Sequence, residues 1–433
     1  MILSNKFNEK SFAVYGLGKT GKSVINFLKK SGVSRYLVWD DNVKKRREFN
    51  IKKNIKFFSD FLDFADYIVT SPGINLKKSV LVKKFKKNQR KIITDIDLLY
   101  MTKNVPKTIV ITGTNGKSTT CKILEYLLQK NKIKVKLGGN IGNPILDLKN
   151  LSSSICIIEA SSFQLAHSKY IKPKYATILN LSKDHLDWHG NVENYINSKF
   201  KAFNLQDKHC LVFLSAKSLI YRYKKKKYLG KLKTYNIKSY LRIKNRIKND
   251  YLNLKVNDQN LSFVYEISKF LKIKKKNFIS SLTNFKGLQH RHETFIKLKN
   301  INFINDSKAT SFEASKHAIE NNKNIFWIVG GLPKLGDKFN LEKIKKNINT
   351  SFIIGTNPAF FKKQLKSNKL TFKVTKNLKN TIRIIFKEIL KNPEKKITVL
   401  LSPASASYDQ YKNFMERGNE FKQLVKLYAR RYI

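Results

Sequence analysis

Short apolar runs alternate with amphipathic stretches from one end of the chain to the other. The apolar runs are rich in valine and isoleucine and are bounded by polar residues or glycine, which is typical of buried strands. They predict strands at Ser11–Gly16, Tyr36–Trp39, Tyr67–Thr70, Thr108–Thr112, Ile155–Glu159, Ala176–Asn180, Leu211–Leu214, Ile301–Ile304, Ile325–Val329, Phe352–Gly355 and Thr398–Leu401. Helical spacing follows many of these runs, for example at Lys117–Lys130 and Tyr195–Phe203. The alternation predicts an α/β fold of open, mostly parallel sheets with flanking helices.

The pattern divides the 433 residues into three domains, a number that the length also suggests. One boundary lies near Lys103–Pro106 and the other near His292–Phe295. We therefore expect domains over residues 1–103, 104–294 and 295–433. The lysine-rich segment Ser215–Asn260 has a weak pattern, and we expect it to form an irregular edge of the middle domain.

Composition narrows the class of protein. The hydrophobic fraction of 41% is ordinary for a globular chain, and no apolar run is long enough to span a membrane. The first ten residues lack the apolar core of a secretory signal. The three cysteines, Cys121, Cys156 and Cys210, match no metal-binding spacing and leave one unpaired, which favours reduced thiols. We expect a cytoplasmic protein, a monomer, without membrane insertion.

The net charge of +57, from 87 lysine and arginine residues against 30 acidic ones, raises the possibility of a nucleic-acid-binding NTPase. The lysines are spread along the whole chain and accompany abundant asparagine, isoleucine and phenylalanine, as the codons of an AT-rich genome would produce. We therefore favour solvated lysines over a nucleic-acid surface and expect no nucleic-acid partner. Attraction of an anionic substrate by the positive charge is compatible with both explanations, solvated lysines and a nucleic-acid surface.

A complete G-x-G-x-x-G stands at Gly16–Gly21, between a predicted strand and a predicted helix, and Asp40 follows at the end of the next strand. Backbone amides at such a helix start bind a diphosphate, and the acid suits a ribose. The motif by itself is compatible with NAD(P), with another phosphate-bearing ligand, or with a structural tight turn.

A second glycine motif, G-T-N-G-K-S-T at Gly113–Thr119, also joins a strand to a helix. It lacks the first glycine of the longer phosphate-loop pattern, because Ile111 stands there. The chemistry requires Gly116 for close backbone approach, Lys117 beside the terminal phosphates and a hydroxyl, Ser118, for Mg²⁺. We favour a mononucleotide site over a structural turn.

Polar residues follow three further predicted strands. Glu159 ends an apolar strand, where a metal-binding acid of a phosphate site would lie, although a solvated strand end is the alternative. The polar residues of D-H-L-D-W-H, at residues 184–189, suit the binding of a metal ion or a phosphate. A polar segment exposed to solvent explains them equally well. In the last third, Q-H-R-H-E at 289–293, N-D-S-K-A-T at 305–310 and the tract 400–421 place small and polar residues at strand ends, the usual ligand edge.

Together these motifs resemble the Mur ligase family, the ATP-dependent amide ligases of peptidoglycan precursor synthesis, over nearly the whole chain. The resemblance is strongest to the family member that adds D-glutamate to UDP-N-acetylmuramoyl-L-alanine. It rests on G-L-G-K-T-G, S-P-G-I, G-G-N-I-G-N-P, I-N-D-S-K-A-T and S-P-A-S-A-S-Y-D-Q-Y-K-N-F-M-E-R-G-N-E-F. The D-N-P-R motif of the diaminopimelate-adding relative is absent. A different amino acid or a folate-type acceptor is the rival within the family.

The resemblance implies a Rossmann-like first domain, a P-loop ATPase-like central domain and a Rossmann-like third domain. It also implies two steps: the substrate carboxylate attacks ATP to give an acyl phosphate, and the amine of D-glutamate displaces phosphate. Catalytic roles fall to Lys117, His185 and Lys199. Two Mg²⁺ sites would use Ser118, Glu159, His185 and Lys199, the last in an N6-carboxylated form. Lys199 is singled out only by its spacing after D-H-L-D, since lysines are everywhere.

The resemblance distributes the binding residues over the three domains. For ATP it implies Gly113, Thr114, Asn115, Gly116, Lys117, Ser118, Thr119, Asn257, Asn260, Arg291 and Asp306. For the UDP-linked substrate it implies Gly18, Lys19, Thr20, Asp40, Asp41, Gly73, Asn75, Asn140, Ser161, Gln164 and His185. For D-glutamate it implies Lys308, Thr310, Lys334, Ser407, Tyr408 and Phe414.

Two positions depart from the family pattern. Val256 stands where a histidine is expected before Asn257, which weakens the adenine-side assignment of Asn257 and Asn260. Trp188 stands where an arginine is expected in D-H-L-D-x-H, so the contribution of that arginine is absent or comes from another residue such as Lys183.

Overall fold

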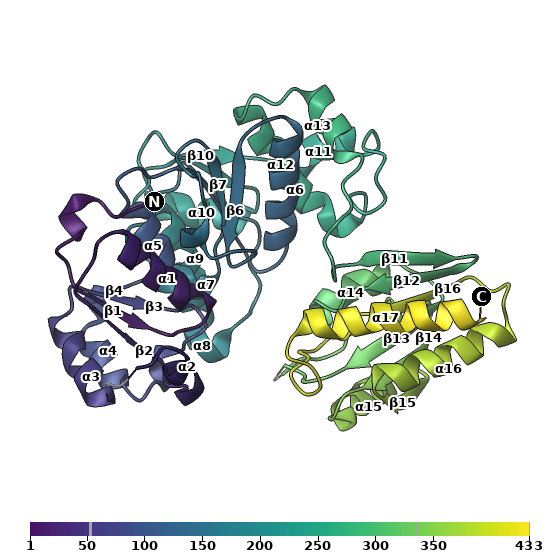
Figure 1. The fold of residues 1–433 in the computed structure, drawn as a ribbon. Helices are drawn as coiled ribbons and strands as arrows, with labels where there is room; N and C mark the ends of the chain where they lie inside the picture. The colour runs from purple at the N-terminus through teal and green to yellow at the C-terminus, as the bar shows by residue number, and fades with distance from the viewer. Residues whose placement is uncertain (52–53, 335, 433) are drawn as a thin grey trace. The chain divides into compact units, whose positions relative to one another are not determined.

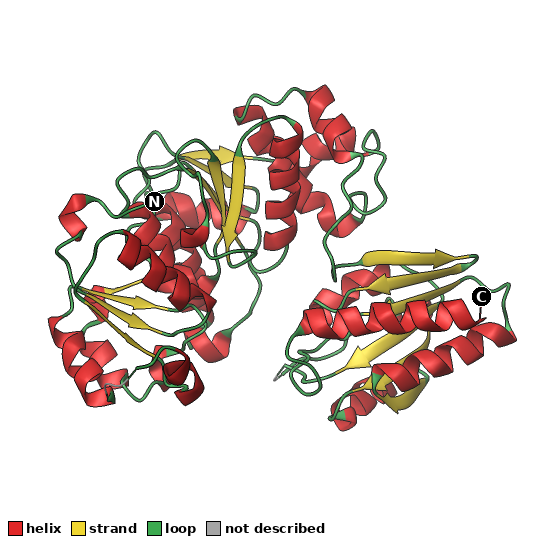
Figure 2. Ribbon diagram, viewed as in Figure 1, coloured by secondary structure: helices red, strands yellow, loops and turns green. Residues whose placement is uncertain are grey.

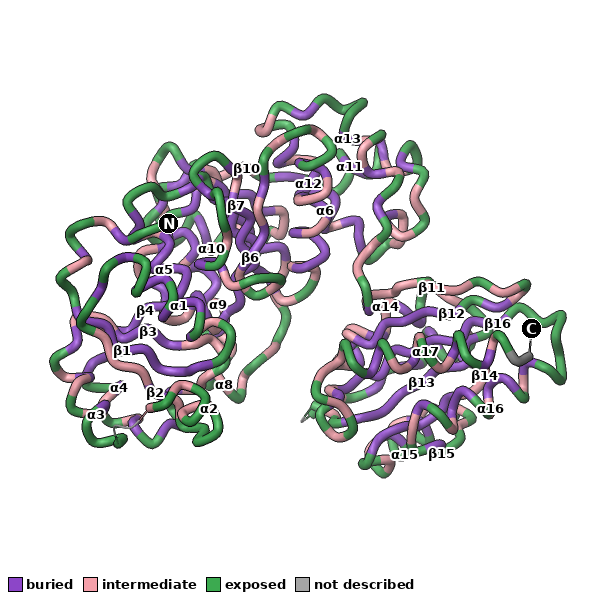
Figure 3. Tube along the Cα trace, in the orientation of Figure 1, coloured by how far each residue is buried: buried purple, intermediate pink, exposed green. Residues whose placement is uncertain are grey.

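The computed structural model describes residues 1–51, 54–334 and 336–432. Two compact units make up the chain, Met1–Phe285 and Lys286–Ile433, and each is described by itself. The first unit contains two β-sheets and the second unit contains one, all flanked by helices (Figures 1 and 2). The strands are largely buried and the outward faces of the helices exposed, which places the cores between the sheets and their helices (Figure 3).

The first sheet has four parallel strands in the order β2-β1-β3-β4. Its strands are β1 (Phe12–Tyr15), β2 (Tyr36–Trp39), β3 (Tyr67–Thr70) and β4 (Ile92–Ile93). Its helices are α1 (Lys19–Lys30), α2 (Val43–Glu48), α3 (Ile55–Phe64), α4 (Val82–Lys87) and α5 (Asp95–Tyr100). β1 is buried at all four positions because helices cover both of its faces, which explains why its sequence is apolar without alternation.

The second sheet has six parallel strands in the order β10-β9-β8-β5-β7-β6. They are β5 (Lys107–Thr112), β6 (Val135–Gly139), β7 (Ile155–Glu159), β8 (Tyr175–Ile178), β9 (Leu211–Leu214) and β10 (Lys231–Thr234). Its helices are α6 (Lys117–Lys130), α7 (Ser162–His167), α8 (Leu186–His189), α9 (Val192–Phe200), α10 (Lys217–Lys225), α11 (Ile237–Lys244), α12 (Asp258–Phe270) and α13 (Lys275–Leu282). β5, β7 and β8 are adjacent, so their carboxyl ends meet at one edge.

The second unit holds a six-stranded sheet in the order β11-β12-β16-β13-β14-β15, in which β11 is antiparallel to β12 and the other pairs are parallel. The strands are β11 (Glu293–Leu298), β12 (Ile301–Asn305), β13 (Ile325–Gly330), β14 (Ile348–Ile354), β15 (Phe372–Lys376) and β16 (Ile397–Leu401). One face is covered by α16 (Leu378–Lys391) and α17 (Phe414–Tyr432). The other face is covered by α14 (Phe312–Glu320) and α15 (Pro358–Ser367).

The α/β class is confirmed, and α6 has the predicted bounds. The prediction of an irregular edge at Ser215–Asn260 is wrong, because the segment forms α10, β10, α11 and the start of α12. β10 was missed because an edge strand with lysines, K-L-K-T, shows no apolar run. The strands β4, β6, β11 and β15 were also missed. The three-domain division stays a prediction, and its second boundary falls inside β11.

Within the described residues, no helix combines the length and the apolar character needed to cross a membrane.

A buried carboxylate ties the first sheet to the second. Asp97, at 0% exposure, accepts hydrogen bonds at Oδ1 from the backbone N–H of Lys169 (2.8 Å) and of Tyr170 (2.7 Å). Its Oδ2 accepts from the backbone N–H of Thr94 (2.9 Å) at the start of α5. A single side chain therefore satisfies donors from two segments that lie far apart in the sequence, beside an apolar cluster shared by both sheets.

Asp97→Ala is expected to lower the free energy of unfolding of the first unit by about 3 kcal/mol, because one buried and two partly buried N–H groups lose their acceptor. Asp97→Asn keeps one carbonyl oxygen and should lose less. Urea unfolding of the full chain measures both changes. The control is Asp60→Ala, which removes an exposed ion pair with Lys84 and should cost less than about 0.5 kcal/mol. An Asp97→Ala midpoint equal to that of the control would contradict this prediction.

Candidate active site

The turn between β5 and α6 has the backbone of a phosphate-binding loop. Gly113 and Gly116 adopt φ values of +150° and +81°, which residues with a side chain rarely adopt. A Cβ at Gly116 would also lie 2.2 Å from Oδ1 of Asn260, so the loop is closed against α12 at this point. Both conformational requirements fall within the short loop, which is why a glycine at Ile111 inside β5 is not needed.

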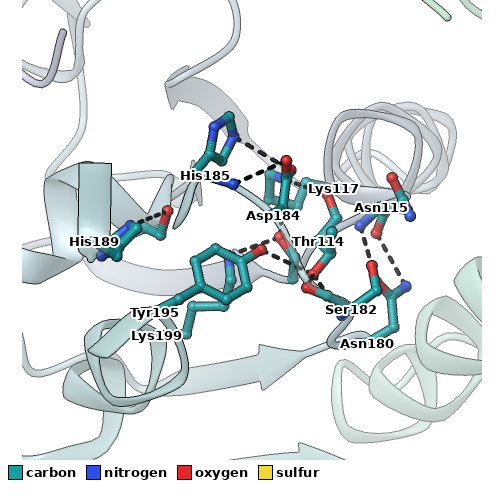
Figure 4. Close-up of polar contacts among 12 residues, drawn as sticks. Thr114, Asn115, Lys117, Asn180, Ser182, Asp184, His185, His189, Tyr195 and Lys199 are labelled. Carbon is teal, nitrogen blue, oxygen red and sulfur yellow. Dashed lines mark hydrogen bonds and ion pairs between the residues drawn. The ribbon is translucent and has the colours of Figure 1, made fainter. Parts of the chain in front are cut away.

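The loop is held in shape by hydrogen bonds that need no ligand (Figure 4). Lys117 Nζ donates to the carbonyl oxygens of Gly113 (2.9 Å) and Thr114 (2.8 Å). Asn180, two residues after β8, accepts from the N–H of Asn115 (2.9 Å) and donates to its carbonyl (3.1 Å). The N–H of Thr114 donates to the carbonyl of Asn180 (3.0 Å). The loop is therefore preorganised, which lowers the entropy lost when it binds phosphate.

A second lysine reaches the same loop from α9. Lys199 is 1% exposed, and its Nζ donates to the carbonyl of Gly113 (2.9 Å) (Figure 4). Burial, and then the charge of Lys117, lower the pKa of Lys199 well below its usual value. The ring of Tyr195 lies 4.7 Å from Nζ, and its hydroxyl hydrogen-bonds Oγ1 of Thr114 (2.8 Å). Burial and the charge of Lys117 favour the neutral amine of Lys199.

Glu159, at the end of β7, is the carboxylate of the same edge. It pairs in register with Ile111 of β5, so it lies beside the start of the loop. The side chain is 1% exposed, and its Oε1 accepts from Nδ2 of Asn140 (2.8 Å). Its Oε2 is buried without a hydrogen-bond partner, an unusual state for a carboxylate oxygen. Ser118 is also buried, in the first turn of α6.

This donor set suits a hard cation such as Mg²⁺. A carboxylate oxygen without a partner and a hydroxyl are oxygen ligands, and Mg²⁺ completes its shell with phosphate oxygens and water. Among the residues that the structure describes, no group of three His, Cys, Asp or Glu side chains could hold a metal ion. A site here would therefore depend on oxygen atoms supplied by the substrate.

His185 is presented by a strained backbone next to this edge. Its φ of 52° is left-handed, and it caps the single-turn helix α8. Its Nε2 lies 3.3 Å from Oδ2 of Asp184, and its ring lies 4.7 Å from that of Phe163 (ring centroids). At the other end of α8, Nε2 of His189 hydrogen-bonds Oγ of Ser162 (3.0 Å) (Figure 4), and burial lowers the pKa of His189 to about 4.

Two of the predicted substrate-binding residues form a capping box at the start of α7. Oγ of Ser161 accepts from the N–H of Gln164 (3.2 Å), and Oε1 of Gln164 accepts from the N–H of Ser161 (3.1 Å). Nε2 of Gln164 lies 3.4 Å from Oδ1 of Asp95, a buried acid whose pKa rises to about 6 because of burial. Their observed contacts orient α7, and their contact with substrate stays a prediction.

The glycine motif of the first sheet forms the expected tight turn. A Cβ at Gly21 would lie 1.8 Å from the carbonyl oxygen of Gly16, so only glycine permits this approach of helix to strand. Oδ2 of Asp40 accepts from the N–H of Leu17 (2.7 Å), inside the turn itself. Oδ2 of Asp41 accepts from the hydroxyl of Tyr15 (2.5 Å). Both acids thus support the binding loop, and the predicted uridine contacts of these residues are untested.

The remaining predicted residues of the first unit lie as follows. Lys19 and Thr20 open α1, and Gly73 and Asn75 lie in the loop after β3. Nδ2 of Asn257 donates to the carbonyl of Tyr251 (2.7 Å), and Nδ2 of Asn260 lies 3.4 Å from Oδ1 of Asn257. The two asparagines are buried at the start of α12, which packs on α6.

In the second unit, Asp306 follows β12 and is buried. It accepts from the N–H of His292 (3.0 Å) and from Oγ of Ser402 (2.7 Å), and burial raises its pKa to about 7. Nζ of Lys308 lies 3.8 Å from the ring centroid of Phe414, so these two predicted D-glutamate residues come together. Ser407 is buried and Tyr408 is exposed. Arg291, Thr310 and Lys334 lie in loops of this unit, and the structure does not test their roles.

Arg417 lies near these residues of the second unit and was recognised from the sequence only as part of the C-terminal motif. It is 1% exposed, with Nε on Oγ of Ser307 (3.0 Å) and Nη2 on the carbonyls of Ser307 (2.9 Å) and Ser405 (3.0 Å). The guanidinium therefore joins α17, the end of β12 and the loop that carries Ser407. In the sequence it stands within F-M-E-R-G-N-E-F, where no local pattern marks it as buried. Asn180 and Tyr195 were missed likewise, although Asn180 ends a predicted strand and Tyr195 begins a predicted helix.

Two family models match this chain. The Mur ligase middle domain matches residues 111–284, and the MurD-like N-terminal domain of Mur ligases matches residues 10–94. A UDP-N-acetylmuramoylalanine–D-glutamate ligase of Wolbachia pipientis wMel is 33% identical, with 98% of this chain and 97% of that protein covered. The enzyme of the same name from Buchnera aphidicola subsp. Schizaphis graminum is 34% identical, with 98% and 99% covered.

Solved structures share the fold at lower identity. The ligase MurF of Thermotoga maritima in complex with ADP has a TM-score of 0.57 and 15% identity, with 100% of this chain and 98% of that chain covered. UDP-N-acetylmuramate-alanine ligase MurC of Thermotoga maritima has a TM-score of 0.57 and 16% identity, with 97% and 100% covered. These likenesses extend over the whole chain and concern the fold.

Gly116→Ala is expected to weaken nucleoside triphosphate binding about tenfold or more, because the added Cβ meets Asn260 and the left-handed φ strains alanine. Isothermal titration with the triphosphate measures the change. Gly32→Ala is the matched control: Gly32 also has a left-handed φ (+73°), but a Cβ there meets no atom within 4 Å. If the two variants lose affinity equally, the loop geometry is not what binds the phosphates.

Proposed function

The chain belongs to the Mur ligase family, and we propose that it adds D-glutamate to UDP-N-acetylmuramoyl-L-alanine, with ATP converted to ADP and phosphate. The Wolbachia and Buchnera relatives are named for this reaction, and the similarity extends over nearly the full length of both. The observation that carries the proposal is the pair Lys117 and buried Lys199 on one phosphate loop, beside Glu159 with an unpartnered carboxylate oxygen.

The first step is phosphoryl transfer. A carboxylate oxygen of the muramoyl-alanine end attacks the γ-phosphorus of ATP, the bond from the γ-phosphorus to the β–γ bridging oxygen breaks, and ADP leaves. The backbone amides of the loop and the N-terminus of α6 bind the phosphates, and Lys117 neutralises the charge that develops between them. The loop is already ordered, so its contribution is mainly positioning.

The second step forms the amide. The amine of D-glutamate attacks the carbonyl carbon of the acyl phosphate, a C–N bond forms, phosphate leaves and the nitrogen loses a proton. We assign the two carboxylates of D-glutamate to cations of the second unit, Lys308 and Lys334, with Thr310, Ser407, Tyr408 and Phe414 around them. The buried Arg417 fixes the loop that carries Ser407.

We assign Mg²⁺ binding to Ser118 and Glu159, and a second Mg²⁺ to His185. The unpartnered Oε2 of Glu159 supports the first assignment. When bound, Mg²⁺ supplies charge neutralisation for the phosphate oxygens.

We propose that Lys199 is used as its N6-carboxylate. Its lowered pKa leaves a neutral amine that can attack CO₂, forming an N–C bond with loss of a proton. The product would place an anion beside the cation of Lys117, and the two charges would attract each other. It would also offer oxygen atoms to the second Mg²⁺.

For the rest of the substrate, we assign the uridine diphosphate to the turn at Gly18–Thr20 with Asp40, Asp41, Gly73 and Asn75. We assign the binding of the muramoyl-alanine end to Asn140, Ser161, Gln164 and His185. We assign the binding of the base and ribose of ATP to Asn257, Asn260, Arg291 and Asp306. We further propose a cytoplasmic monomer without a nucleic-acid partner.

The direct test measures phosphate release with ATP, Mg²⁺ and UDP-N-acetylmuramoyl-L-alanine against a panel of amino acids. We expect release with D-glutamate and little with L-alanine, L-lysine or diaminopimelate. A preference for one of these three would overturn the assignment of the amino acid. Omission of the UDP-linked substrate is the control for uncoupled ATP hydrolysis.

Lys199→Ala is expected to lose activity at least about a hundredfold, because the second anion of the site is missing. Short carboxylic acids, added at high concentration, should restore part of the activity by occupying the vacated volume. The matched control is Lys201→Ala, which alters a half-buried lysine two residues further along. Full activity of Lys199→Ala without any acid would remove this lysine from the mechanism.

A further inference from the structure

Trp188 is a residue of the D-H-L-D-W-H segment to which the proposed chemistry gives no role. Its indole ring lies among three rings of the same region, with centroid distances of 5.0 Å to Phe163, 5.6 Å to His167 and 4.6 Å to His189. Phe163 and His167 belong to α7, whereas Trp188 and His189 belong to α8. The indole therefore forms a large part of the contact between these two helices.

The helix α8 has little means of holding its own orientation. It is a single turn of four residues, too short to be stable by itself, and the residue at its start is His185 with a left-handed φ of 52°. Its last residue, His189, is fixed by the hydrogen bond between its ring and the hydroxyl of Ser162, and its carbonyl accepts from Nδ2 of Asn194 (3.1 Å). Trp188 fixes its body against α7.

The helix α7 is the element that connects α8 to the metal-binding edge. It begins at Ser162, three residues after Glu159, and its capping box fixes that start. Phe163, in its first turn, contacts both Trp188 and the ring of His185, whose centroid lies 4.7 Å away. A shift of α8 on α7 would therefore move His185 relative to Glu159.

We propose that Trp188 is a positioning residue for His185, acting through its contacts with Phe163 and His167 to fix the imidazole relative to the metal-binding edge that includes Glu159. The inference rests on the proposed function for the role of His185. Aromatic pairs at these separations stabilise a contact beyond the area they bury, and the indole has no charge that could itself bind metal or phosphate. Burial lowers the pKa of His167 to about 4, so the ring that faces Trp188 is neutral at physiological pH.

The test compares the Mg²⁺ dependence of phosphate release in full-length variants. Trp188→Ala should raise the Mg²⁺ concentration for half-maximal activity at least fivefold and lower kcat, with the KM for ATP unchanged. Trp188→Phe keeps a ring on α7 and should stay within about twofold of the wild type. Tyr265→Ala, which removes a half-buried ring from Phe278 elsewhere in the unit, should leave the Mg²⁺ dependence unaltered.

A double-mutant cycle separates positioning from general destabilisation. If Trp188 acts through His185, adding Trp188→Ala to His185→Ala should change the Mg²⁺ dependence no further. Equal, additive effects in both backgrounds would overturn the inference, as would a Trp188→Ala variant with the wild-type Mg²⁺ dependence. A matching shift in Tyr265→Ala would overturn it too.

A measurement without acceptor substrate keeps the inference distinct from the proposed function. Mn²⁺ binding in the presence of ADP, followed by electron paramagnetic resonance, should be at least fivefold weaker in Trp188→Ala than in the wild type. If Trp188→Ala binds Mn²⁺ more weakly but the wild type releases no phosphate with D-glutamate, the proposed function is contradicted and the positioning role stands. If the wild type is active with D-glutamate and Trp188→Ala binds Mn²⁺ as tightly as the wild type, the positioning role is overturned and the proposed function stands.

Discussion

The loop between β5 and α6 is built around a buried lysine amine. Lys199 reaches the carbonyl of Gly113 from α9, next to a loop that already carries Lys117. Two cations at one loop would repel each other, and the site accommodates them by burying one, which lowers its pKa and favours the neutral amine. The ring of Tyr195 lies 4.7 Å from this amine.

Parallel strands bring the other groups to the same place. β5, β7 and β8 are neighbours, so the loop, Glu159 and Asn180 leave the sheet at one edge although they are far apart in the sequence. Hydrogen bonds within the protein already occupy most of these groups. Glu159 keeps one buried carboxylate oxygen without a partner, and this exception is the best structural argument for a cation at the edge.

Several side chains that are predicted to bind substrate form hydrogen bonds to the protein's own backbone. Asp40 accepts the N–H of Leu17 within the glycine turn, and Ser161 and Gln164 cap α7. In the second unit, Arg417 donates hydrogen bonds to carbonyl and hydroxyl oxygens and thereby fixes the loop of Ser407. These contacts rigidify the places where substrate is expected, which is how a fold preorganises a site.

The α/β class, the two glycine turns and the strand ends that carry Glu159 and Asp306 could all be predicted from local sequence patterns. Each depends on local requirements, such as a buried run of apolar residues or a φ that only glycine adopts readily. The sequence left β10 unseen, because an edge strand buries too little to show an apolar pattern. It could not distinguish Lys199 among 87 basic residues except by spacing. The burial of this lysine, the contacts of Asn180 and Tyr195 with the loop and the bonds of Arg417 to the loop of Ser407 emerged from the fold alone, because burial and contact depend on distant segments that no local pattern records.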